Sequence, residues 1–196
     1  MAKLYFYYGP MGSAKTMQLL TTAYNFQEHN IPILCLKPAT DTRDGTAIIK
    51  SRTGLNRPCI LISDSDNIEI IIKDKPVKWI LVDECQFLTT AQVNQLAKIV
   101  DNRNINVMCF GLRTDFQSNL FEGSARLLAI ADDIVEIKSS CDCGKKAIIN
   151  ARFDADGNII TNGKQIDIGG NEKYRSICRE CWHKLTKSWL QDFFFI

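Results

Sequence analysis

Residues 9–16 read GPMGSAKT and have the residue types of a phosphate-binding loop. The P-loop pattern G-x-x-x-x-G-K-[ST] surrounds phosphate oxygens with backbone N–H groups and sends its lysine to the β- and γ-phosphates. Ala14 stands where the second glycine is expected, and it can serve there only if its φ is negative, because glycine alone adopts a positive φ without cost. The stretch predicts a nucleotide-binding loop, against the alternative of a plain strand–turn–helix corner. The candidate residues are Gly9, Pro10, Met11, Gly12, Ser13, Ala14, Lys15 and Thr16.

Two carboxylates follow the apolar run VKWILV at residues 77–82. An acidic residue at the end of a buried strand is the usual partner of Mg²⁺ beside a P-loop. A structural role as a helix N-terminal charge seldom needs two of them. We therefore expect Asp83 to complete the Mg²⁺ shell through water, with the hydroxyl of Thr16 as a direct ligand. Glu84, next to the metal, is suited to act as the general base on an acceptor hydroxyl.

Four of the eight cysteines form two close pairs near the C-terminus. The layout is C-x-C, then 34 residues, then C-x-x-C, which is typical of a closed and therefore structural Cys₄ zinc site. The alternative is a set of reactive or merely buried thiols. The predicted ligands are Cys141, Cys143, Cys178 and Cys181. Among the scattered cysteines, Cys85 adjoins the expected base and could make the activity sensitive to thiol reagents.

The elements that must position these groups alternate along the chain. Apolar runs that suit strands buried on both faces occupy residues 4–8, 33–36, 59–62, 77–82, 106–110 and 134–137. Helical patterns occupy residues 15–28, 66–73 and 89–100. This alternation predicts an α/β fold: a P-loop (RecA-like) parallel sheet with helices on both faces and a ligand beyond the carboxyl ends of the strands.

The character of the chain changes after residue 138. We expect a P-loop ATP-binding α/β domain at 1–138 and a small zinc-binding domain at 139–196, which has a hairpin turn at 154–158 and a terminal helix to about residue 192. The polar, glycine-containing stretches 38–57 and 111–124 follow strands and are therefore expected at the site. Aromatic residues near them could line a flat pocket for a base or simply plug loops onto the core.

Composition bounds the possible functions. The chain has 196 residues, of which 45% are hydrophobic and 23% charged, and its apolar runs are far shorter than the ~20 residues of a membrane span. No secretory signal is visible, so a cytoplasmic location without membrane association is expected. Residues 1–138 carry 15 basic and 15 acidic side chains, and residues 139–196 carry 9 and 7, which argues against a nucleic-acid-binding surface.

Taken in order, the motifs resemble those of the zinc-containing thymidine kinases of the cytosolic type, found in bacteria, animals, some DNA viruses and phages. The resemblance covers essentially the whole chain, and the C-x-C-G and GLRTDF forms are similar to proteobacterial and phage members. Ala14, Gly12 and Cys85 depart from the usual pattern. The motifs are GPMGSAKT (9–16), KPATDTRDG (37–45), SRTG (51–54), VDECQF (82–87), FGLRTDF (110–116), FEGS (121–124), CDCGKKA (141–147) and IGGNEKYRSICREC (168–181).

This resemblance implies ATP-dependent transfer of a phosphoryl group to the 5′-hydroxyl of thymidine or deoxyuridine, with Mg²⁺ bound and Glu84 as the base. It adds to the ATP and Mg²⁺ site Asp41, Arg43 and Gln86, of which Arg43 would stabilise transferring charge. The thymine pocket would be walled by Phe87, Leu112, Phe116 and Phe121. The loop that closes over the nucleoside would comprise Gln165, Ile166, Asp167, Ile168 and Gly169, followed by Tyr174.

The resemblance also implies a homotetramer that is inhibited by thymidine triphosphate and serves pyrimidine salvage for DNA synthesis. Two other classes of function stay open at this point. One is a P-loop ATPase or nucleic-acid-binding module whose zinc segment grips DNA or RNA. The other is a zinc-stabilised binding protein with an inactive P-loop.

Overall fold

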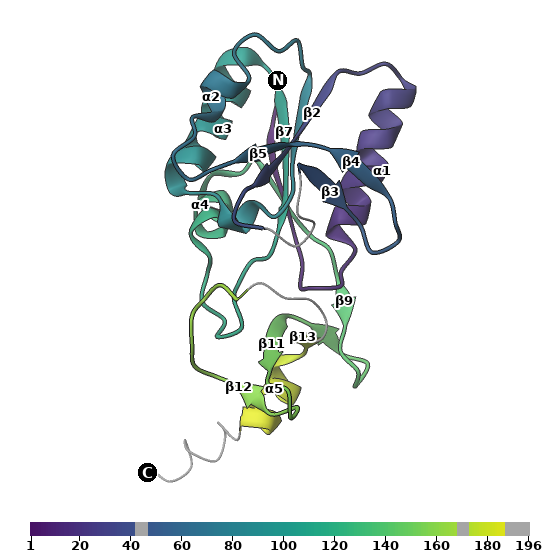
Figure 1. The fold of residues 1–196 in the computed structure, drawn as a ribbon, viewed down its shortest axis with the longest axis vertical. Coiled ribbons are helices and arrows are strands. Elements are labelled where there is room, and N and C mark those ends of the chain that lie inside the picture. The colour runs from purple at the N-terminus through teal and green to yellow at the C-terminus, as the bar shows by residue number, and fades with distance from the viewer. Residues whose placement is uncertain (42–46, 168–172, 187–196) are drawn as a thin grey trace.

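The computed structural model describes residues 1–41, 47–167 and 173–186 (Figure 1). Its centre is a six-stranded sheet in which all neighbouring strands are parallel, in the order β5-β2-β6-β7-β1-β8. The strands are β1 (Leu4–Tyr8), β2 (Ile33–Pro38), β5 (Ile60–Ile62), β6 (Trp79–Val82), β7 (Asn106–Gly111) and β8 (Asp133–Glu136). Each corresponds to one of the six predicted apolar runs. The predicted parallel α/β fold is therefore confirmed.

Helices cover both faces of this sheet, as expected (Figure 1). Helix α1 (Lys15–Glu28) packs on one face, where its Leu19 and Ala23 meet Leu81 and Phe110. The other face is covered by α2 (Ile68–Ile71), α3 (Thr90–Arg103) and α4 (Glu122–Ile130). Because successive side chains of a strand point to opposite faces, each central strand supplies both cores.

The structure differs from the predicted elements in three places. Helix α4 was not predicted, and it begins at the end of a stretch that reads as loop. The polar stretch 38–57 contains the hairpin of β3 (Ile48–Lys50) and β4 (Asn56–Pro58). Three-residue strands are too short to show a period of two. The predicted helix at 66–73 is reduced to α2, whose N-cap Asn67 accepts hydrogen bonds from Glu69 and Ile70.

The C-terminal region forms two small antiparallel sheets and one helix below the large sheet (Figure 1). The elements are β9 (Ser139–Ser140), β10 (Lys146–Ala147), β11 (Ile149–Phe153), β12 (Ile159–Ile160), β13 (Tyr174–Ile177) and α5 (Arg179–Thr186). The predicted hairpin is present, since β11 pairs with β12 around residues 154–158. The rest of the predicted terminal helix lies outside the described residues. No helix in the described part of the chain is both long and apolar enough to cross a membrane.

Candidate active site

The phosphate loop joins β1 to α1 at the carboxyl edge of the sheet. Gly12 and Ala14 have positive φ values of 74° and 63°. The expectation that Ala14 keeps a negative φ is therefore wrong, because the turn into the helix needs the left-handed conformation at this position. Ala14 is the N-cap of α1 and provides no side-chain cap, and the first turn holds no acidic residue. These features leave a helix N-terminus suited to anion binding.

Lys15 folds back over its own loop. Its Nζ donates to the carbonyl oxygens of Gly9 at 3.0 Å and Pro10 at 2.8 Å, and it lies 3.4 Å from Oγ of Ser13. The side chain is buried but also lines the cavity described below. The ammonium group is therefore held at the loop, where it could transfer its hydrogen bonds to phosphate oxygens.

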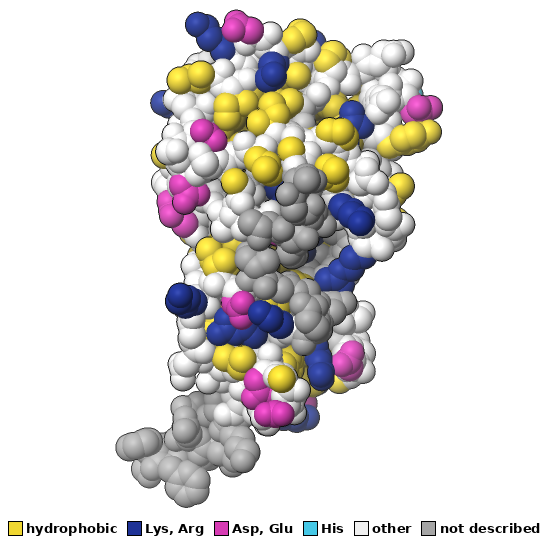
Figure 2. Space-filling view, in the orientation of Figure 1, with side chains coloured by type: hydrophobic (Ala, Val, Ile, Leu, Met, Phe, Trp, Pro, Cys, Tyr) yellow, Lys and Arg dark blue, Asp and Glu magenta, His cyan; other side chains and the backbone are white. Residues whose placement is uncertain are grey.

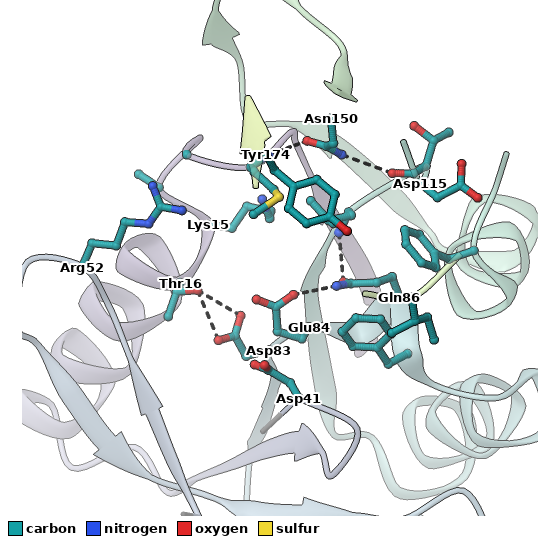
Figure 3. A pocket seen from close by; sticks show the side chains of 18 of the residues that line it. Lys15, Thr16, Asp41, Arg52, Asp83, Glu84, Gln86, Asp115, Asn150 and Tyr174 are labelled. Carbon is teal, nitrogen blue, oxygen red and sulfur yellow. Dashed lines mark hydrogen bonds between the residues drawn. The ribbon is translucent and has the colours of Figure 1, made fainter. Parts of the chain in front are cut away.

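Thr16 and Asp83 face each other across the floor of the site (Figure 3). Oγ1 of Thr16 lies 3.2 and 3.3 Å from the two carboxylate oxygens of Asp83. Burial, followed by the charge of Glu84, raises the pKa of Asp83 from 3.8 to about 7. A hydroxyl and a buried carboxylate at this separation are the donor set that Mg²⁺ takes beside a P-loop. The residues present therefore fit a magnesium ion.

Glu84 leaves β6 in a left-handed conformation, with φ 50° and ψ 39°. Nε2 of Gln86 donates a hydrogen bond of 2.6 Å to its Oε2, and the N–H of Leu112 donates one of 3.0 Å to Oε1 of Gln86. The amide of Gln86 is thereby oriented at both ends. A non-glycine residue with positive φ at the start of a 3₁₀ turn is a conformation that often accompanies function.

These groups line one cavity of about 430 Å³ between the large sheet and the small C-terminal sheets. Figure 3 shows Lys15, Asp83 and Glu84 around it, with Thr16 beside Asp83 and Asp41 below that pair. Asp41 is buried and forms an ion pair with the buried Lys37 at 3.0 Å. Charged groups that a phosphoryl-transfer site requires thus surround a single hollow.

The structure brings most of the predicted site residues to this cavity. Its lining includes Met11, Gly12, Ala14, Lys15, Thr16, Asp41, Asp83, Glu84, Gln86, Phe87, Leu112, Phe116, Phe121, Gln165, Ile166, Asp167 and Tyr174. Of the loop residues, Gly9, Pro10 and Ser13 lie behind it and contact Lys15 instead. The predicted site residues Arg43, Ile168 and Gly169 lie outside the described residues.

Aromatic side chains form one wall of the cavity. The rings of Phe87 and Phe121 pack edge to face with centroids 5.8 Å apart. Phe116 is buried under the guanidinium of Arg152, whose Cζ lies 3.8 Å from the ring centroid. Tyr174 donates its hydroxyl to the carbonyl of Asp167 at 2.8 Å. A flat apolar wall beside a polar loop is a suitable pocket for a planar base.

Several lining residues were not predicted. They are Met17, Lys50, Ser51, Arg52, Thr53, Thr114, Asp115 and Asn150. Five of them belong to the motifs SRTG (51–54) and FGLRTDF (110–116), but the resemblance assigns none of these five a role at the site. Asn150 lies outside these motifs, and its signal is a buried polar residue inside the otherwise apolar run AIINA at residues 147–151.

Cys85 faces the core rather than the cavity. Its side chain is fully buried and packs with Leu88 and Cys109. Burial, together with a hydrogen bond to Cys109, raises the pKa of the Cys85 thiol well above its ordinary value. A thiol that is both buried and protonated is inert. The expected sensitivity to thiol reagents at this position therefore has no structural basis.

The four predicted zinc ligands do come together. The four cysteine sulfur atoms all lie within 4.8 Å of one another, and Sγ of Cys143 is 3.6 Å from Sγ of Cys178. Zinc–sulfur bonds of about 2.3 Å in a tetrahedron would place the sulfurs about 3.8 Å apart. The cluster therefore fits a Cys₄-bound zinc ion. The ion would join β13 and α5 to the turn after β9.

Comparison with known proteins connects this site to a named family. The family model described as thymidine kinase matches residues 2–182. The thymidine kinase of Enterobacteria phage T4 is 47% identical over 191 residues, covering 95% of this chain and 98% of its own. The thymidine kinase of Zymomonas mobilis is 48% identical over 183 residues, with 91% and 95% covered. That of Rhodopirellula baltica is 45% identical, with 91% and 87% covered.

Proposed function

The chain belongs to the thymidine kinase family, and we propose that it transfers the γ-phosphoryl group of ATP to the 5′-hydroxyl of thymidine or deoxyuridine, with Glu84 as the general base. One observation carries the finer part of this proposal. The carboxylate of Glu84 lies in the same cavity as the phosphate loop and the aromatic wall, so it can reach an acceptor hydroxyl placed between them (Figure 3).

On the phosphate side, the loop N–H groups and Lys15 would hold the phosphates of ATP. Thr16 and Asp83 would hold Mg²⁺, which when bound would neutralise charge on the transferring phosphoryl group. Asp41, which forms an ion pair with Lys37 at the cavity, would lie near the phosphates. Arg43 would stabilise the transferring charge, as the family motif implies.

On the acceptor side, Glu84 would take the proton of the 5′-hydroxyl as that oxygen attacks the γ-phosphorus. Gln86 is proposed to act through Glu84, because both ends of its amide are already engaged by Glu84 and the N–H of Leu112. This assignment replaces the expected direct contact of Gln86 with ATP or Mg²⁺. A base whose carboxylate is oriented before substrate binds loses less entropy in the reaction.

The nucleoside base would lie against the wall of Phe87, Phe116 and Phe121, with Leu112 at its edge. The segment 165–170 would close over it and offer backbone groups to the pyrimidine. Gln165 already links this segment to the opposite loop, since its amide donates to Asp115 at 2.9 Å. Backbone hydrogen bonds in a narrow pocket favour a pyrimidine over a larger purine.

Further properties are proposed from the sequence pattern and the family resemblance. They are a division at residue 138 into ATP-binding and zinc-binding domains, a homotetramer, inhibition by thymidine triphosphate, a cytoplasmic location and a role in pyrimidine salvage for DNA synthesis. The four paired cysteines would hold a structural zinc ion.

A phosphorylation assay across thymidine, deoxyuridine, deoxycytidine and deoxyadenosine tests the proposal. We expect ATP-dependent products from the first two nucleosides and little from the others. The variant Glu84→Gln should lose about 10²- to 10⁴-fold in kcat while ATP and thymidine still bind. If Glu84→Gln phosphorylates thymidine at the normal rate, Glu84 is not the base.

The rival reading as a nucleic-acid-binding module makes a separate prediction. Such a protein should bind DNA with an affinity that falls steeply with salt. On the face drawn in Figure 2, basic side chains are spread over both halves of the molecule with acidic side chains between them, which does not favour that reading. Tight, salt-dependent DNA binding without nucleoside phosphorylation would support it.

A further inference from the structure

The backbone of Met11, at the tip of the phosphate loop, is held by two side chains from the small C-terminal sheet. The N–H of Met11 donates to Oδ1 of Asn150 at 2.7 Å. The carbonyl oxygen of Met11 accepts a short hydrogen bond from Oγ of Ser176. Both backbone polar groups of one loop residue are thus satisfied by a segment more than 130 residues away in the sequence.

The two side chains reach the loop together because of strand register. Asn150 on β11 and Ser176 on β13 are directly opposite each other in an antiparallel pair. Residues that face each other across such a pair project from the same side of the sheet. Their polar atoms can therefore grip the N–H and the C=O of a single residue, an arrangement we call the Met11 clamp (Asn150 and Ser176).

Asn150 also connects the phosphate loop to the nucleoside side of the cavity. Its Nδ2 donates to the carbonyl oxygen of Thr114 at 3.2 Å (Figure 3). The amide has no freedom to flip, because one end must accept from Met11 and the other must donate to Thr114. The side chain is buried, so both hydrogen bonds are shielded from water.

We propose that Asn150 and Ser176 are positioning residues that keep the phosphate loop in its ATP-binding geometry through the backbone of Met11. This inference rests on the proposed binding of ATP at residues 9–16. A P-loop binds phosphate mainly through backbone N–H groups, so the peptide orientation at its tip decides how many of them aim at the ligand. The neighbouring positions Gly12 and Ala14 are both left-handed, a conformation that an anchored tip helps to maintain.

Ser176 gives the cleaner test, because Asn150 lines the cavity and Ser176 does not. The variant Ser176→Ala removes the hydroxyl that donates to Met11. We expect the affinity for a non-hydrolysable ATP analogue to fall by about three- to tenfold, with a matching rise in KM for ATP. The KM for thymidine should stay within about twofold, because no substrate contact is removed.

A matched pair separates the hydrogen bond from packing. Ser176→Thr keeps the hydroxyl. Ser176→Val introduces a side chain of nearly the same shape as threonine but without the hydroxyl, and both residues suit a strand. The threonine variant should retain the affinity for the ATP analogue, and the valine variant should show the loss expected for alanine. Ser140→Ala, at an exposed position of β9, removes a hydroxyl from the same small region and should leave both affinities unchanged.

The outcomes distinguish this inference from the proposed function. If the wild-type protein phosphorylates thymidine but Ser176→Ala and Ser176→Val bind the ATP analogue as tightly as it does, the Met11 clamp has no positioning role. Equal weakening in the threonine and valine variants would also overturn the proposal, because it would indicate packing alone. If the wild-type protein binds ATP but phosphorylates none of the four nucleosides, the kinase proposal fails while the clamp can still be measured by analogue binding.

Discussion

Nε2 of Gln86 lies 2.6 Å from Oε2 of Glu84, and this hydrogen bond fixes the carboxylate at the mouth of the 3₁₀ turn η1 (Cys85–Phe87). The neighbouring Gly111 leaves the space that Gln86 needs, since a Cβ on Gly111 would lie 2.5 Å from Oε1 of Gln86. The glycine of the FGLRTDF motif therefore has a packing role in orienting the proposed base. Gln86 is buried and donates its hydrogen bond to Glu84 instead of to water.

Replacing Gln86 with methionine should lower kcat by about tenfold to a hundredfold, because Glu84 loses the contact that orients it. The KM for ATP should change little, and the KM for thymidine should change less than kcat. Steady-state kinetics with both substrates measure this split. The exposed Gln27, which accepts a hydrogen bond from Arg57 far from the cavity, gives the control variant Gln27→Met. An unchanged kcat in folded Gln86→Met protein would show that Glu84 needs no such support.

Ala14→Gly should stabilise the ligand-free protein. A left-handed alanine costs roughly 1–2 kcal/mol, and the extra chain entropy of glycine in the unfolded state offsets about 0.5–1 kcal/mol of that gain. A net gain of about 0.5–1 kcal/mol in the free energy of unfolding follows, measurable by urea denaturation. Ala91→Gly, at an exposed site in α3, makes the same chemical change in an ordinary helix and should destabilise by about 0.5–1 kcal/mol. Loss of stability in both variants would mean that the loop does not hold Ala14 under strain.

Asp83→Asn should stabilise the metal-free protein at pH 8 but hardly at pH 4. The folded state holds the proton of Asp83 up to a pKa of about 7, whereas an unperturbed aspartate releases it near 3.8. As the pH rises from about 4 to 7, the free energy of unfolding therefore falls, by an amount on the order of 1–4 kcal/mol. Asparagine removes the ionisation and with it the loss.

Thermal unfolding without Mg²⁺ or nucleotide, followed from pH 4 to pH 8, measures this effect. The control is Asp101→Asn, at an exposed position of α3 remote from the cavity. We expect the difference in melting temperature between Asp83→Asn and wild type to grow with pH, and the difference for Asp101→Asn to stay flat. A difference that is constant across the range would rule out an elevated pKa for Asp83.

The protein should contain one zinc ion per chain, held by the cysteine quartet. Cys178→Ser should lose the metal and lower the melting temperature by at least about 5 °C, because the ion joins elements with few other contacts. The half-buried Cys59 offers the control Cys59→Ser, which should keep full zinc content. Zinc analysis by mass spectrometry and thermal unfolding test this. Full metal content in Cys178→Ser would exclude a four-sulfur site.

Zinc removal should also weaken binding at the phosphate loop. Ser176 and Cys178 lie two residues apart at the end of β13, so loosening the metal site should loosen the Met11 clamp. We expect chelation to reduce the affinity for an ATP analogue at least threefold in the wild type. In Ser176→Ala, where the contact is already lost, the further reduction should be smaller. The same reduction in both proteins would show that metal and loop are not connected through Ser176.

Features that depend on neighbours in the sequence could be predicted. The six core strands show as continuous apolar runs because both faces of a parallel sheet are buried. The loop at 9–16, the carboxylates of Asp83 and Glu84 and the two cysteine pairs follow from residue type and spacing. Short elements such as β3 and β4 could not be found, because three residues carry too little pattern and their stability comes from packing against α1.

The amino-acid sequence by itself determined the positions of the six core strands along the chain, the position of the phosphate loop and the identity of the cysteine cluster, because each rests on local periodicity or local spacing. Only the tertiary structure decided that Ala14 is left-handed, that Gln86 holds Glu84 and that Asn150 and Ser176 hold Met11. These relations depend on backbone dihedrals and on contacts between segments distant in the chain, and the free energy of such contacts leaves no periodic trace in the sequence.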